Sequence, residues 1–319
     1  MKHFLSLLLF SHVLIVSEVF AGGVEDITKY QFSFLDTAHA SVSNQVLYIS
    51  NKIDSIVGGV NKKYRSSRTQ VYMKITTENN QGEKPHVYQS IGARLDLPRT
   101  QGRLKLLVSS GLADGNGETS KNISAKPQNK LTQDEEPGAF STAMQYLVSL
   151  NKFWKLDYRT GIDLKDNKLY PFARLYSRQT FRQDVWRERL VGQVYLHTAN
   201  GSGYETTMDI ERNFFSTSLF KLTSKAQWSQ ETKIIEVSQT ANLSYKLMKD
   251  VFLIHSLAAI GSYSGSPDLE RYAISTQCRY KLHRKWTYLE ISPVVNFDRL
   301  ENFKPRFSIK TSIEVLFGY

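Results

Sequence analysis

The C-terminal stretch 304–319, KPRFSIKTSIEVLFGY, constrains the fold more than any other part of the sequence. From Phe307 to Tyr319 every second residue is apolar or neutral, and residues such as Lys310 and Glu314 occupy the positions between. Side chains of a β-strand point alternately to opposite faces, so a period of two over about a dozen residues predicts one long strand. We expect one face of this strand to be apolar and the other to be charged.

The same alternation recurs from Arg68 to the end of the chain. The predicted strands run close to ten residues, the length with which a tilted strand crosses a bilayer, whereas strands of soluble sandwiches usually have ~5 to 6. Counting them gives about fourteen strands, within a range of twelve to sixteen, and single-chain bacterial barrels have even counts. The sequence therefore predicts an all-β fold, a transmembrane antiparallel β-barrel over 68–319.

Composition narrows the class of protein. A hydrophobic content of 41% and a mean hydropathy of -0.36 exclude a helical membrane protein. Cys278 is the single cysteine, which excludes a disulfide framework and a cysteine-based metal site. The formal net charge of +11 suggests an anionic solute or acidic lipid, and because no run of clustered Lys or Arg occurs we expect no nucleic-acid partner.

The N-terminal region departs from the strand pattern. Residues 1–21 have a basic start, an apolar centre and a small residue at the end, which predicts a secretory signal peptide cleaved after Ala21; an uncleaved anchor is the alternative. Residues 22–67 form a periplasmic segment with a short amphipathic helix over 38–57, ended by Gly58-Gly59. This helix either packs at the barrel mouth, plugs the lumen or binds a periplasmic partner.

The long irregular segment 111–138 is rich in Gly, Asn and charged residues. Asp114, Asn116 and Glu118 have the spacing of calcium ligands, but the pattern of a calcium-binding loop is incomplete. We therefore expect a solvated loop outside the cell and no metal.

The ending SIEVLFGY resembles the C-terminal closing strand of Gram-negative outer-membrane β-barrels. The chain as a whole is similar to porin-like barrels of proteobacteria. This resemblance covers the signal peptide and nearly all of 68–319, and it implies the outer membrane of a Gram-negative bacterium, with outer-membrane lipid as a partner. It also implies that Phe317 and Tyr319 form the signal recognised by the barrel-assembly machinery. No substrate follows from it.

The polar face of each predicted strand should line the lumen. The basic candidates for that lining are Arg94, Lys105, Arg159, Arg174, Arg178, Arg187, Arg189, Lys221, Lys225, Arg271, Arg279 and Lys310, and the acidic candidates are Asp157, Glu205, Asp209, Glu211 and Glu314. A wet lumen with excess positive charge favours anions. The alternative is that most of these charges pair across strands and fill a narrow or plugged interior.

These patterns favour a porin-like channel for small polar or anionic solutes. A structural or assembly barrel with a plugged lumen and a periplasmic partner is the alternative. An enzyme acting on lipid would need a nucleophile and a histidine within hydrogen-bond reach at the lipid boundary. Because no histidine lies in a recognisable nucleophile motif, we expect no enzyme, no catalytic residue and no cofactor.

Overall fold

A computed structural model describes residues 33–57, 69–97, 100, 103–110, 140–149, 151, 153–165, 167–214, 217–282 and 285–318. The predicted signal peptide 1–21, the loop 111–138 and Tyr319 lie outside these residues. The chain divides into two compact units, Met1–Ser43 and Asn44–Tyr319, and the second holds the whole sheet.

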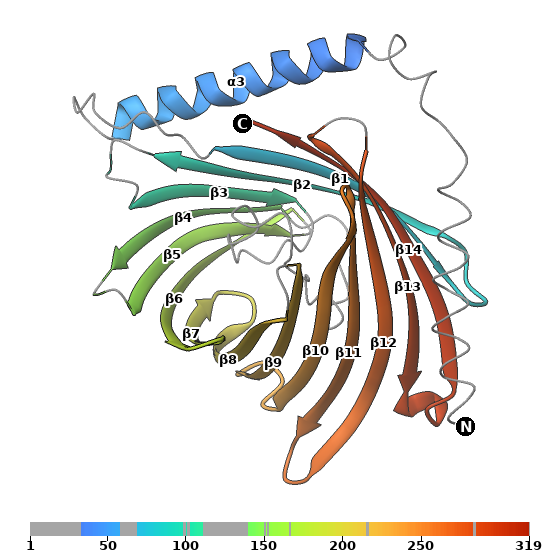
Figure 1. The fold of residues 1–319 in the computed structure, drawn as a ribbon. Helices are drawn as coiled ribbons and strands as arrows, with labels where there is room; N and C mark the ends of the chain where they lie inside the picture. The colour runs from blue at the N-terminus through green and yellow to red at the C-terminus, as the bar shows by residue number, and fades with distance from the viewer. Residues whose placement is uncertain are drawn as a thin grey trace. The chain divides into compact units, whose positions relative to one another are not determined.

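The described residues form fourteen antiparallel strands that close into a barrel, with β14 beside β1 (Figure 1). The predicted fold class and strand number are thereby confirmed. The strands are β1 (Gln70–Asn80), β2 (His86–Leu97), β3 (Leu104–Ser110), β4 (Phe140–Ser149), β5 (Trp154–Lys165), β6 (Lys168–Gln183), β7 (Trp186–His197), β8 (Gly201–Phe214), β9 (Ser218–Ser229), β10 (Ile235–Met248), β11 (Val251–Tyr263), β12 (Pro267–Lys281), β13 (Thr287–Asp298) and β14 (Pro305–Phe317).

Each strand pairs with its neighbours in sequence, and the closing pair joins the two ends of the sheet. Ile75 of β1 lies opposite Ile313 of β14, in a run of ten directly opposed residues. Closure leaves no unpaired sheet edge, as a wall in contact with lipid requires. We call the end of the barrel where β1 begins and β14 ends the terminal end, and the other end the opposite end.

The two faces of the wall differ in polarity. In β7, Leu190, Val194 and Leu196 are exposed, whereas Arg189 is half-buried and Gln193 is buried. Exposed apolar side chains recur on the same face of the other strands, including Ile75, Val87, Leu175, Leu243, Leu257 and Ile313. A closed wall is concave inside and convex outside, so the more exposed apolar face is the outer one and the polar face lines the interior.

Two inward tyrosines cover glycines on the neighbouring strand. Tyr72 lies opposite Gly92, and Tyr195 lies opposite Gly203. At either glycine, a Cβ atom would collide with the ring of the opposing tyrosine. The aromatic ring therefore occupies the space above the glycine and closes the inner surface of the wall.

Helix α3 (Ser33–Val57) begins five residues before the predicted start at residue 38. Asp36 lies in its first turn, where negative charge favours the N-terminus of a helix. Beyond Asn44, the hydroxyls of Ser50 and Thr69 lie 2.7 Å apart and both residues are buried. None of the described helices is long and apolar enough to cross a membrane.

Candidate functional site

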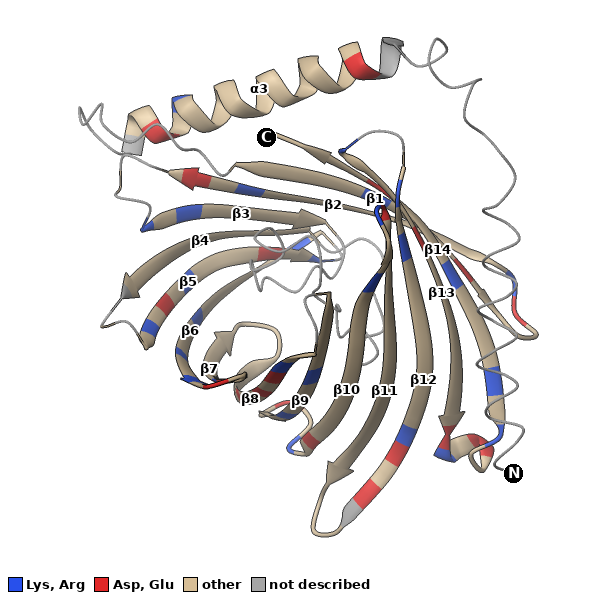
Figure 2. Ribbon diagram, in the orientation of Figure 1, with Lys and Arg blue, Asp and Glu red and all other residues tan. Residues whose placement is uncertain are grey.

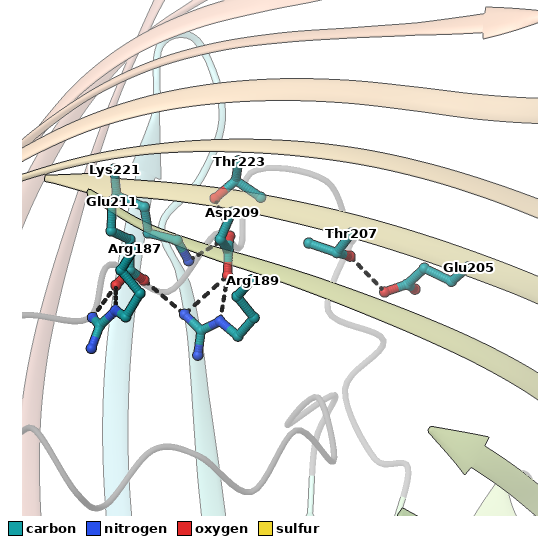
Figure 3. A network of polar contacts seen from close by, with 8 residues as sticks. All are labelled: Arg187, Arg189, Glu205, Thr207, Asp209, Glu211, Lys221 and Thr223. Carbon is teal, nitrogen blue, oxygen red and sulfur yellow. Dashed lines mark hydrogen bonds and ion pairs between the residues drawn. The ribbon is translucent and has the colours of Figure 1, made fainter. Parts of the chain in front are cut away.

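The inner wall carries networks of ion pairs rather than isolated charges. The first links β7, β8 and β9 (Figure 3). Arg189 lies 3.0 Å from Asp209 and 2.7 Å from Glu211, and Arg187 donates to the same Glu211 from its Nε at 2.7 Å. From the other side, Lys221 lies 2.9 Å from Asp209. Each of these two carboxylates therefore interacts with two bases.

Two further contacts complete the network on β8 and β9. Thr223 donates its hydroxyl to Asp209 at 2.7 Å, and Lys225 lies 3.1 Å from Glu205. Ion pairs thus connect the acidic inner face of β8 to the basic inner face of β9. They join neighbouring strands and stiffen the wall.

A second network links β12, β13, β14 and β1 around Glu290. Its carboxylate accepts from Lys74 at 2.6 Å and is also ion-paired with Arg279. Arg279 lies 2.9 Å from Glu314 as well, and its guanidinium stacks over the ring of Tyr288, 4.2 Å from the centroid. The Glu290 side chain is only 4% exposed, so its charge depends on these two cations.

Two smaller networks lie on β2 to β6. Arg94 is 3.2 Å from Asp96, and Lys105 is 3.9 Å from the same carboxylate. Arg159 is 3.3 Å from Asp157 and stacks over the ring of Tyr176 at 4.2 Å, with both charges buried. Arg174 stacks over Phe172 at 4.8 Å.

At the opposite end the wall encloses a cavity of about 550 Å³. Acidic and basic residues from several strands line it, among them Glu78, Lys225, Glu236, Arg271, Asp298 and Lys310. Lys310 lies 3.0 Å from Glu78, and Arg271 is ion-paired with Asp298. Figure 2 shows the mixture of signs where β12 begins. Among the described residues, no group of three or more His, Cys, Asp or Glu could hold a metal ion.

All seventeen of the predicted charged candidates lie on described strands. Ten of the twelve bases form the ion pairs given above. Phe317 pairs with Val71 at the closing seam. Sequence reasoning missed Tyr176 and Tyr288 as cation–π partners, because an inward aromatic residue among arginines gives no motif.

A polar cluster lies on the outer face. His255 of β11 lies directly opposite Leu243 and Thr276, on the side of the wall where Leu243 is exposed. Its Nδ1 is 2.9 Å from the hydroxyl of Thr276, and its Nε2 is 3.0 Å from the hydroxyl of Tyr245. Since these residues come from three strands, no sequence motif could have predicted the cluster.

A closed antiparallel barrel with an apolar outer wall and a charged inner wall is a porin-like barrel of the outer-membrane type. That is the class to which this chain's architecture belongs.

No protein-family model matches the sequence, and no curated protein matches it either. Several solved structures are similar. The outer membrane channel DcaP of Acinetobacter baumannii has 10% identity and a TM-score of 0.49 over 82% of this chain and 99% of that chain. OmpT of Vibrio cholerae has 9% identity and a TM-score of 0.46 over 81% and 99%. KdgM porin in complex with disordered oligogalacturonate has 7% identity and a TM-score of 0.37 over 76% and 98%.

Proposed function

We propose that this protein is an outer-membrane channel for small polar or anionic solutes in a Gram-negative bacterium. One observation carries the proposal: Asp96, Asp209, Glu211 and Glu290 each interact with two bases. Together with Glu314, which shares Arg279 with Glu290, these networks hold seven bases and five acids, so pairing leaves them with a net positive charge. Fixed positive charge in a lumen with low-dielectric walls concentrates anions and repels cations.

Planar-bilayer recordings with purified protein test this proposal. We expect ion conductance and, across a salt gradient, a reversal potential of the sign that anion selectivity produces. Lys221→Gln removes one inward charge and should shift the reversal potential toward zero. The matched control is Lys249→Gln, which removes the same charge from the exposed β10–β11 turn and should shift it less. Absent conductance, or cation selectivity, contradicts the proposal.

The alternative is a structural or assembly barrel with a plugged lumen and a periplasmic partner. Helix α3 would contact that partner, and the barrel-assembly machinery would recognise Phe317 and Tyr319 in either case. Deleting 38–57 distinguishes the roles, because removal of a plug raises the conductance, whereas removal of a docking helix leaves it unchanged. Lipid hydrolysis by the same preparation would instead indicate an enzyme, for which the Thr276–His255–Tyr245 cluster is the candidate site.

A further inference from the structure

Three pairs of like charges lie directly opposite one another on the inner faces of β5, β6 and β7. Arg159 lies opposite Arg174, Lys155 opposite Arg178, and Arg182 opposite Arg187. We call these six residues the basic ladder and each pair a rung. Like charges directly opposite each other destabilise a sheet. On the neighbouring strands the pattern is the reverse, since Arg187 and Lys221 both lie opposite Glu211.

The rungs are regularly spaced along β6. Arg174, Arg178 and Arg182 are four residues apart and share one face of the strand. Adjacent rungs are therefore about 13 Å apart, and the ladder extends over about 26 Å, at ~3.3 Å per residue. A small anion can contact only one rung at a time. An extended chain of anionic groups can contact all three.

Charge balance and exposure both favour a ligand. Across 155–159, 174–182 and 187–189, the inward positions hold seven bases, which are Arg189 and the six ladder residues, and a single acid, Asp157. Arg187 and Arg189 also pair with Asp209 and Glu211 of β8, so bases still outnumber acids by seven to three. Lys155 and Arg182 are exposed, and the side chain of Arg187 is 42% exposed. Arg174 and Arg178 are half-buried, and Arg159 is buried in its pair with Asp157, so Arg174 is the more accessible member of its rung. The exposed groups lie toward the terminal end, where water reaches them.

We propose that the basic ladder binds a linear polyanion whose carboxylate or phosphate groups each occupy a rung. Guanidinium groups suit this role because they bind either oxyanion through two parallel hydrogen bonds. The bound polyanion would replace the repulsion within each rung by attraction. This inference rests on the proposed channel function and specifies that the anionic solute is an extended chain.

Block of the ionic current in planar bilayers tests whether the basic ladder binds polyanions. The probes are linear polyphosphate and poly-glutamate, both long enough to reach across the rungs, with orthophosphate and free glutamate as the short counterparts. We expect the polyanions to block the current and the short anions to block it far less. The double variant Arg174→Gln/Arg178→Gln should weaken the polyanion block about tenfold or more. Block by only one polyanion identifies the preferred oxyanion.

The matched control is Lys225→Gln/Lys310→Gln, which also removes two inward charges but lies outside the ladder. Both double variants should lower anion selectivity, whereas only the ladder variant should lose polyanion block. Equal loss of polyanion block in both double variants, or equal block by short and long anions, contradicts polyanion binding by the ladder. Complete absence of conductance contradicts the proposed channel function instead. Calorimetric titration of the detergent-solubilised barrel with the same polyanions then tests binding to the ladder separately, and no binding contradicts it.

Discussion

The charge of Glu290 depends on its neighbours. Its carboxylate is almost fully buried between Lys74 of β1 and Arg279 of β12. Removing one member of a buried ion pair leaves the other charge desolvated and uncompensated. Here the loss of one carboxylate would leave two cations in that position.

Glu290→Gln should therefore destabilise the barrel by about 3 kcal/mol, the lower part of the range for a broken buried pair. The measurement is urea unfolding of the protein in lipid vesicles, followed by tryptophan fluorescence. Glu301→Gln is the control, because Glu301 is 37% exposed in its pair with Arg306 and exposed pairs contribute about 0 to 1 kcal/mol. Equal unfolding midpoints for the two variants would contradict the role of Glu290.

The short elements outside the wall have their own electrostatics. In the β1–β2 connection, Glu83 accepts a hydrogen bond from Asn80 at 2.9 Å and another from Arg306 at 2.8 Å. Both bonds favour the charged carboxylate and lower the pKa of Glu83, the bond from Asn80 having the larger effect. Because the folded-state pKa is below the unfolded one, the stabilisation is complete above the unfolded pKa. It is lost as the pH falls through the folded pKa.

Carbon-13 NMR of the glutamate carboxyl groups can follow this titration. We expect the Glu83 midpoint to lie below the ordinary range for glutamate and to rise in Asn80→Ala. Gln81→Ala is the control, since the Gln81 side chain accepts from the Phe307 amide and does not contribute to the lowered pKa of Glu83, and it should leave the midpoint unchanged. An unshifted midpoint in the Asn80 variant would show that the loop hydrogen bond is not formed in solution.

The elements also show where sequence reasoning succeeds and where it stops. A period of two is a local property, so it predicted the strands, their number and their polar faces. Register irregularities are less visible: the β12–β13 pairing is interrupted between Ser275–Val294 and Cys278–Ile291, where Pro293 has no backbone N–H to donate. The amphipathic helix was predicted as well. The face of the helix that is buried was not predicted, because Ser50 and Asp54 are buried while Ile49 and Ile56 are 51% and 76% exposed.

Partner choice on the inner wall depends on register, which a single strand does not encode. Asp209 lies opposite Arg189 on one side and beside Lys221 on the other, so its two partners come from different strands. The basic ladder has the same origin. Arg174, Arg178 and Arg182 are visible in the sequence as inward bases, but their basic partners on β5 and β7 are set by the strand pairing.

At the scale of the whole molecule, the wall depends on one contact between distant parts of the chain. Thirteen of the fourteen strand pairings among the described residues join strands consecutive in sequence, and only β1 with β14 joins the two ends of the sheet. Without that seam, the backbone groups of two edge strands would lie unpaired in lipid, at a cost of several kcal/mol for each group. Barrel formation should therefore be inseparable from pairing of β1 with β14.

A disulfide across the seam tests closure and register together. Thr77 lies directly opposite Thr311, and residues so placed have Cα atoms about 4.5 to 5.5 Å apart, within disulfide range. In a Cys278→Ser background, which removes the only native cysteine, Thr77→Cys/Thr311→Cys should cross-link on mild oxidation. The boiled, cross-linked chain contains a closed loop and should migrate differently from the reduced chain in denaturing gels.

Thr77→Cys/Ser312→Cys is the control, because Ser312 pairs with Thr76 and its side chain points to the other face of the wall. Cross-linking of the control pair at the same rate would indicate another register, and failure of both pairs would indicate an open seam.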